Sequence, residues 1–154
     1  MKIKYNYSLL FFAILVSCGK NHEKTKFVKT NPFSWCQTDS LYYNFENLDP
    51  NIEYLTKITV AHNTDYKYQN IIFLIKNQNK IDTINLQLAK KNGTWKGTGV
   101  GSKRFYSQEI TTRTIKNVNK TSFVLTHSIR DIETSRIKKI KGIASVGLEL
   151  IVIE

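Results

Sequence analysis

Beyond Pro32 the apolar residues of this chain recur with a period of two, and the period of an amphipathic helix is nearly absent. The segment LYYNFE, for example, places Leu41, Tyr43 and Phe45 on one side of an extended strand. Alternation of this kind is typical of strands that bury one face. The chain is therefore expected to build its core between β-sheets and not between helices.

The same alternation returns along the rest of the chain. One-sided apolar runs are Tyr54, Thr56, Ile58 and Val60; Ile84, Leu86 and Leu88; Phe123, Leu125 and Ile129; and Val146, Leu148, Leu150 and Val152. Residues 70–77 (NIIFLIKN) are apolar at successive positions, which predicts a strand covered on both faces. Residues 102–115 are strand-like as well, whereas residues 135–143 fit either a short helix or a loop.

Turn residues separate these runs at 47–51, 77–80 and 90–95, and both prolines lie in connections. Six or more strands with short polar connections predict an antiparallel β-sandwich, jelly-roll-like in architecture. We expect one such domain over residues 32–154.

The N-terminus has the layout of a bacterial export signal. Lys2 and Lys4 precede an apolar run over residues 9–16, which is about half the ~20 residues that a membrane-spanning helix needs. The run ends in LVSC, an order similar to a bacterial lipobox, in which diacylglycerol is attached to the cysteine thiol and the chain is cut before it. The alternative is an ordinary signal peptide with a coincidental cysteine.

On the lipobox interpretation, residues 1–17 are a lipoprotein signal peptide and Cys18 is the lipidated residue. The polar, lysine-rich residues 18–31 are then expected to form a lipidated N-terminus and a flexible tether. Membrane lipid, reached through the acylated Cys18, is thus the first expected partner. Cys36 remains as the second cysteine, and its position beside Trp35 is typical of a small apolar residue at the start of a strand.

Basic residues dominate the charge: 23 Lys and Arg against 12 Asp and Glu give +11, and loss of two lysines with the signal peptide lowers this to +9. The lysines are spread along the chain without the basic run that marks a nucleic-acid patch. Export also removes nucleic acid from the expected partners. We interpret the charge as a solvated face.

Few residues point to chemistry. The three histidines, His22, His62 and His127, lack metal-ligand spacing, and no nucleophile elbow is present, so we predict no catalytic residue, metal or cofactor. His127 shares a face with Phe123 and is expected in the core. The glycines of residues 97–101 match no phosphate-binding motif and are expected to let a large ring such as Trp95, or another chain, pack closely.

The aromatic residues are the better candidates for binding. Tyr66 and Tyr68, two positions apart, share a face if that stretch is extended, and Trp95 follows a turn. Exposed aromatic rings on a β-sandwich can stack on sugars. We therefore name Tyr66, Tyr68 and Trp95 as a possible interaction surface, with burial in the core or at the rim as the alternative.

The chain resembles the gliding-motility lipoprotein H (GldH) family of Bacteroidetes-type bacteria. The resemblance runs from the lipobox to the last strand, through Trp35, DYKYQNI (65–71), DTINLQLAKKNGTWKGTGVGS (82–102) and KGIASVGLEL (141–150). Residues 104–120 match poorly, and Ile129-Arg130 stands where such proteins commonly carry Met-Arg.

This resemblance implies a non-catalytic lipoprotein that is required for gliding motility and works with other envelope proteins of the motility machinery. The alternative hypothesis is a glycan- or peptidoglycan-binding envelope lipoprotein that uses the aromatic platform; an envelope hydrolase has less support, since no catalytic constellation is visible. Gly19 is not an acidic retention residue, and no acidic cluster follows it. We therefore expect an anchor in the outer membrane, facing the periplasm.

Overall fold

The computed structural model describes residues 23–129 and 137–153, and within them the chain forms strands and no helix. The all-β prediction is confirmed. The strands are β1 (Lys24–Lys29), β2 (Trp35–Cys36), β3 (Leu41–Glu46), β4 (Tyr54–His62), β5 (Asn70–Asn77), β6 (Lys80–Gln87), β7 (Arg104–Ile115), β8 (Lys120–His127), β9 (Lys139–Ile140) and β10 (Ile143–Val152).

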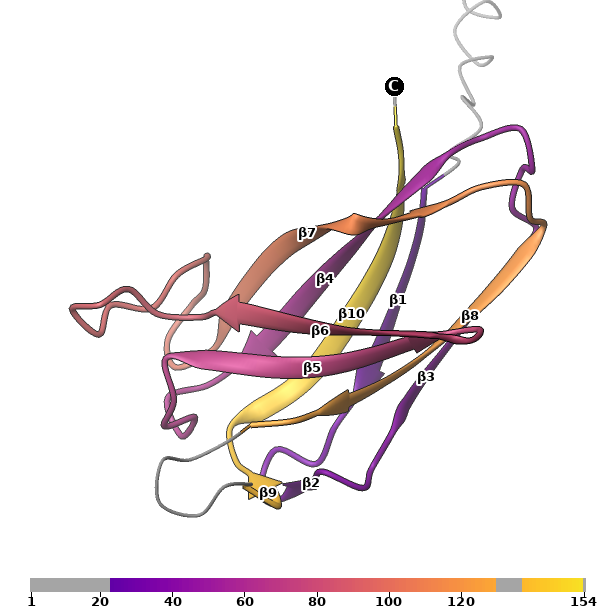
Figure 1. The fold of residues 1–154 in the computed structure, drawn as a ribbon. Coiled ribbons are helices and arrows are strands. Elements are labelled where there is room, and N and C mark those ends of the chain that lie inside the picture. The colour runs from indigo at the N-terminus through magenta and orange to yellow at the C-terminus, as the bar shows by residue number, and fades with distance from the viewer. Residues whose placement is uncertain (1–22, 130–136, 154) are drawn as a thin grey trace, which may run out of the picture.

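Eight of these strands form two four-stranded antiparallel sheets that face each other (Figure 1). One sheet has the order β1-β10-β4-β7 and the other β3-β8-β5-β6, while β2 and β9 pair separately. Taken in chain order, the first of the eight pairs with the last, the second with the seventh, the third with the sixth and the fourth with the fifth. This nesting is that of a long hairpin rolled into two layers, which is the jelly roll. The predicted jelly-roll-like sandwich is confirmed.

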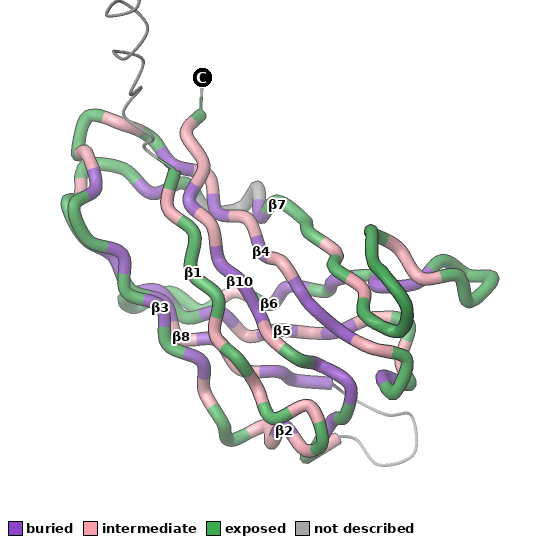
Figure 2. The backbone as a smooth tube through the Cα atoms, turned by 180° about the vertical axis from the view of Figure 1, so that it is seen from behind, coloured by how far each residue is buried: buried purple, intermediate pink, exposed green. Residues whose placement is uncertain are grey.

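The core lies between the sheets and follows the alternation seen in the sequence. Along β3, Leu41, Tyr43 and Phe45 are buried and the residues between them are exposed; Figure 2 shows this change of burial along the strands. Tyr43 also joins the two layers, because its hydroxyl donates a hydrogen bond to the Val146 carbonyl on β10 at 2.8 Å. Burial raises the pKa of Tyr43 above its ordinary value, so the hydroxyl remains a donor at any physiological pH.

β5 differs from the prediction of a strand covered on both faces. Ile71, Phe73 and Ile75 are buried between the sheets, but Ile72 and Leu74 point away from the core and are only half-buried. A two-layer sandwich has nothing to cover the outer face of either sheet. The apolar residues there remain half-buried.

The prediction of a flexible tether over residues 18–31 is wrong for Lys24–Lys29, which form the edge strand β1. Lys24 lies opposite Leu150 of β10 and Lys29 opposite Ser145, in an unbroken antiparallel register. Edge strands bury little side-chain surface, so a polar sequence can form one when a partner strand supplies the backbone hydrogen bonds. Residues 1–22, including Cys18, lie outside the described residues.

The two ends of the sandwich have different connections. At one end β1 begins, β10 ends, and three short connections (47–53, 78–79 and 116–119) join strands; we call it the short-turn end. The other end carries the connections 30–40, 63–69, 88–103 and 128–142, of which residues 130–136 are not described; we call it the loop end. In Figure 1 the longest loop-end connection, 88–103, projects well beyond the sheets.

Candidate functional site

The structure places Tyr66 in the interior of the loop end. Its side chain is 1% exposed, and its hydroxyl donates a hydrogen bond to the Asn70 carbonyl at 2.7 Å. Burial, together with the neighbouring Tyr68, raises the pKa of this hydroxyl above its ordinary value. The segment between β4 and β5 is a turn and not a strand. Tyr66 therefore cannot belong to an exposed interaction surface, and that part of the prediction is wrong.

Tyr68 and Trp95 are half-buried and pack against the core. The Tyr68 ring meets Tyr66 edge-on at 5.5 Å between centroids, and the Trp95 ring lies 4.6 Å from that of His62. The side chains of the three predicted aromatic residues thus pack in the interior of the loop end. They do not form an open platform on which a sugar ring could stack, so the structure gives no support to the glycan-binding alternative.

His62 completes this aromatic cluster. Burial lowers the pKa of its imidazole, and the Arg104 guanidinium lowers it further, while a hydrogen bond to the Asn63 carbonyl acts in the opposite direction. Nδ1 lies 3.3 Å from that carbonyl, and Nε2 has no hydrogen-bond partner among the described residues. The ring is therefore held in its neutral form at neutral pH.

His127 lies in the core, as predicted from its position on the same face as Phe123. Its ring meets Trp35 edge-on at 4.9 Å, and Nε2 lies 3.2 Å from the Trp35 carbonyl. Burial lowers the pKa of this histidine, and the hydrogen bond to Trp35 opposes the shift. Trp35 donates through Nε1 to the Asp39 carbonyl at 2.9 Å. These contacts fix connection 30–40 to the sheet of β3, β8, β5 and β6.

The glycines of residues 97–101 allow close approach of two backbone segments, as predicted. Thr98 forms an isolated bridge with Phe105, and a Cβ atom on Gly97 or Gly99 would collide with backbone carbonyls at the start of β7. The approaching segment is the chain's own β7 and not the ring of Trp95. Connection 88–103 thereby folds back along the edge of the sheet that holds β7.

A groove of about 480 Å³ crosses the loop end over the strands β1, β10, β4 and β7; we call it the loop-end groove. It lies on the outer face of their sheet, where Phe105 is directly opposite Ala61. Its lining residues are Lys29, Thr30, Pro32, Ala61, His62, Asn63, Ser102, Lys103, Phe105, Ala144 and Ser145. Small side chains leave the space, and the described lining contains no carboxylate.

A smaller hollow of about 230 Å³ opens beside this groove. Asp65, Lys67, Tyr68, Lys139, Ile140 and Lys141 line it. The Asn63 N–H donates to the Gly142 carbonyl at 2.8 Å, and this link lies between the two hollows. Three of the six lining residues are lysines, so basic side chains surround both openings.

Eight lysines from three of the four connections lie at the loop end. They are Lys67, Lys90, Lys91, Lys96, Lys103, Lys138, Lys139 and Lys141. Sequence reasoning missed this cluster, because the interpretation of the charge as a solvated face rested on the spacing of lysines along the chain. The topology could have predicted the lysine cluster. Alternate connections of a jelly roll lie at the same end, and the connections at the loop end carry most of the lysines found in connections.

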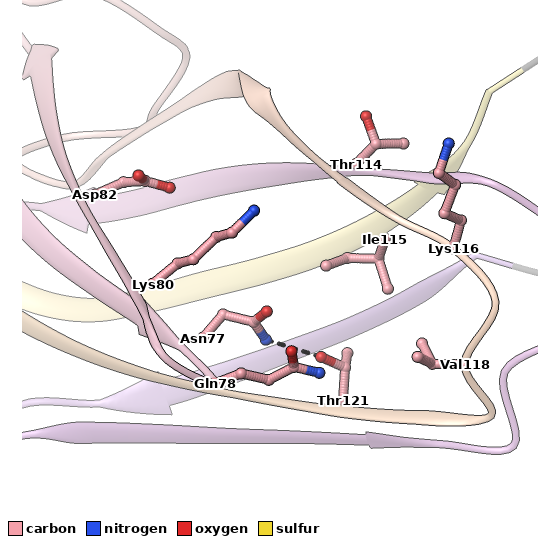
Figure 3. A pocket seen from close by; sticks show the side chains of 9 residues that line it. All are labelled: Asn77, Gln78, Lys80, Asp82, Thr114, Ile115, Lys116, Val118 and Thr121. Carbon is pink, nitrogen blue, oxygen red and sulfur yellow. Dashed lines mark hydrogen bonds between the residues drawn. The ribbon is translucent and has the colours of Figure 1, made fainter.

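A third hollow, of about 360 Å³, lies at the short-turn end between the edge strands β6 and β7 (Figure 3). Lys80 and Asp82 extend from β6, and Thr114 and Ile115 from β7. At its base the Asn77 side-chain amide donates to the Thr121 hydroxyl at 2.8 Å. With one carboxylate among its described lining residues, this hollow has no carboxylate pair for acid–base chemistry.

Among the residues that the structure describes, no group of three or more His, Cys, Asp or Glu side chains could hold a metal ion. Within the same residues no helix is long and apolar enough to cross a membrane.

Comparison with known proteins identifies the family. A model of the GldH lipoprotein family matches residues 21–150. The gliding motility lipoprotein GldH homolog of Christiangramia forsetii is 24% identical over 163 residues, covering 97% of this chain and 97% of that protein. The gliding motility lipoprotein GldH of Flavobacterium johnsoniae is 24% identical over 161 residues, covering 97% of this chain and 98% of its own length.

Among solved structures, the VP2 subviral particle of infectious bursal disease virus aligns with 87% of this chain at 15% identity and a TM-score of 0.33. The alignment covers 33% of the viral chain, and the similarity is too weak to support an argument. The match of the family model, over most of the chain and most of the described strands, decides the matter: this protein belongs to the GldH lipoprotein family.

Proposed function

We propose that this protein is a non-catalytic, lipid-anchored component of the gliding-motility machinery that holds a partner protein at the envelope membrane. Its role as a lipoprotein in gliding motility follows from its family and from relatives that align over nearly their whole length. The observation that carries the finer proposal is the separation of the two ends. The N-terminal lipid would attach at the short-turn end, and the long connections lie at the other.

Cys18 is the residue that we propose to be lipidated. It stands six positions before Lys24, the first residue of β1. Six residues reach at most about 20 Å when fully extended. The sandwich is then held close to the membrane by its short-turn end, so that the loop end faces away from the lipid.

The non-catalytic role is supported by where the perturbed titratable groups lie. The described groups with shifted pKa values are His62, His127, Tyr43 and Tyr66, of which the last three pack in the interior. His62 is 1% exposed and lines the loop-end groove, but the described lining of that groove holds no carboxylate that could orient its imidazole for acid–base chemistry. The outer membrane, at its periplasmic face, remains our proposed location, because Gly19 follows the cysteine and no acidic cluster succeeds it.

Replacing Cys18 by Ala tests the anchor, with Cys36→Ala as the matched control, since both variants lose one thiol. We expect the Cys18→Ala protein to leave the membrane fraction and its cells to lose colony spreading. The Cys36→Ala protein should remain in the outer-membrane fraction and support spreading. A Cys18→Ala protein that stays wholly in the membrane fraction contradicts lipidation at this residue, and cells that spread normally without the gene contradict the motility role.

A further inference from the structure

Charge is distributed unevenly between the two ends of the sandwich. The described connections of the loop end contain eight lysines and two aspartates, whereas those of the short-turn end contain one lysine, one aspartate and one glutamate. Both loop-end aspartates accept hydrogen bonds within their own turns, Asp39 from the Cys36 N–H at 3.2 Å and Asp65 from the Asn63 amide at 3.0 Å. None of the eight lysines forms an ion pair with a described carboxylate. Their charge is therefore available to a partner.

The loop-end groove combines this charge with apolar surface. Ala61, Phe105 and Ala144 contribute apolar side chains, and Phe105 is 47% exposed, so its ring is open to contact. Lys29 from the end of β1 and Lys103 from the residue before β7 come from opposite edges of the same sheet. A ligand lying across the groove would meet Lys29 at one edge and the small side chains of Ala144 and Ala61 over β10 and β4. At the other edge it would meet Phe105 together with Lys103.

The dimensions of the groove fit an extended peptide segment. It crosses four neighbouring strands. Strands lie about 4.8 Å apart, so three spacings give roughly 14 Å, the length of about four extended residues. An extended chain places successive side chains on opposite sides. Residues two apart share a side, so acidic residues near the ends of the segment could reach Lys29 and Lys103 while apolar side chains between them lie on Ala61 and Phe105.

Two other anionic partners fit the groove less well. A bilayer surface needs protruding apolar groups, whereas the groove is hollowed and the exposed Phe33 and Val100 of the neighbouring connections do not line it. An acidic polysaccharide would be expected to stack on open aromatic rings, but Tyr66, Tyr68 and Trp95 pack inwards and Phe105 is the one aromatic residue that lines the groove, apart from the neutral His62.

We propose that the loop-end groove binds an extended, acidic segment of a partner envelope protein, with apolar side chains on Phe105 and carboxylates at Lys29 and Lys103. The location of that partner in the envelope rests on the proposed function; the chemistry of the groove does not. The surrounding lysines increase the rate of association and attract further acidic residues outside the groove.

The test uses the full lipoprotein in nanodiscs of zwitterionic phosphatidylcholine. The probe is a fluorescein-labelled octapeptide with two glutamates at each end and four valines between them, and binding is measured by fluorescence anisotropy. Two comparison peptides replace glutamate by lysine or valine by serine. We expect saturable binding of the first peptide, weaker binding of the serine peptide and none of the lysine peptide, with affinity falling as salt is raised.

The double variant Lys29→Glu/Lys103→Glu should raise the Kd by about tenfold or more, because two attractive contacts become repulsive. Its matched control, Lys76→Glu/Lys120→Glu, changes the net charge equally at exposed lysines away from the loop end and should change the Kd less than about twofold. Phe105→Ala should weaken binding of the valine peptide but not of the serine peptide.

Three results would overturn the proposal. They are no saturation by the acidic peptide up to about 1 mM, an equal loss of affinity in both double variants, and tighter binding of polygalacturonate or phosphatidylglycerol vesicles that depends on Lys29 and Lys103. Because this assay contains no cells, its failure leaves the motility role intact. Conversely, normal spreading without the gene would leave the groove's binding chemistry intact.

Discussion

Gly142 joins three connections of the loop end through its backbone. Its N–H donates to the Pro32 carbonyl at 2.8 Å, and its carbonyl accepts from the Asn63 N–H at 2.8 Å. Its φ of +85° lies in the left-handed region that side chains other than glycine rarely adopt. A Cβ atom here would also collide with the backbone nitrogen of Tyr66. The positions of connections 30–40 and 63–69, which line the two loop-end hollows, thus depend on a residue without a side chain.

Gly142→Ala should lower the free energy of unfolding by about 3 kcal/mol or more, because strain at positive φ adds to a backbone collision. Gly93→Ala is the matched control: its φ is +84°, but nothing lies within 4 Å of the added Cβ. Gly93→Ala should lower the free energy of unfolding only by the strain at positive φ, about 1 kcal/mol. Urea unfolding followed by tryptophan fluorescence measures both. Equal losses for the two variants would show that the packing around Gly142 is not as described.

Single residues also show where sequence reasoning succeeds. His127 is placed correctly in the core because it lies within a strand, where alternation fixes which face a side chain occupies. Tyr66 is misplaced because it lies in a turn, where no period links sequence position to exposure. Its backbone packs against Gly142 of connection 128–142, and such a long-range contact leaves no local pattern.

At the scale of elements, the strands with one buried face are predicted well and the edge strand β1 is missed. The sequence KTKFVK shows no clear alternation of apolar and polar residues, and within it only Lys24 and Val28 are half-buried. Its pairing with β10 comes from backbone groups that every sequence possesses. Patterns of side chains therefore identify the strands that build the core, but not a strand that merely completes a sheet.

Val28→Asp tests whether β1 is a structural strand. Val28 is half-buried opposite Val146, whose side chain is in the core, whereas the adjacent Lys29 is exposed opposite Ser145. We expect Val28→Asp to lower the free energy of unfolding by about 2 kcal/mol, since a carboxylate replaces packed apolar surface. Lys29→Asp, the neighbouring control, should change it by less than about 0.5 kcal/mol. If residues 24–29 were a flexible tether, neither substitution would change the free energy of unfolding.

At the scale of the whole molecule, topology creates the candidate site. Lys29 and Lys103 are 74 positions apart in sequence, and the jelly roll brings both to one groove. The sequence predicted the fold class that causes this, yet it did not predict which connections would share an end, since the pairing order of the strands was not assigned. The same topology places the start of β1 at the opposite end.

The orientation of the anchored protein follows from this arrangement and can be measured by energy transfer to a dye in the bilayer. β10 alone has ten residues, so the ends of the sandwich lie roughly 34 Å apart at about 3.4 Å per residue. We would place one fluorophore at Asn119→Cys on the short-turn end or at Lys91→Cys on the loop end, each in a Cys36→Ser background. Both positions are exposed.

On the proposed lipidation of Cys18, six residues before β1, transfer from Asn119→Cys should be strong and transfer from Lys91→Cys weak. The difference should shrink when about twenty Gly and Ser residues are inserted after Cys18, because a flexible linker of that length lets the domain rotate and move away from the bilayer. Equal transfer from both positions in the unmodified chain would mean that the sandwich lies flat or inverted. In that case the loop-end lysines would face lipid and not a partner across the envelope space.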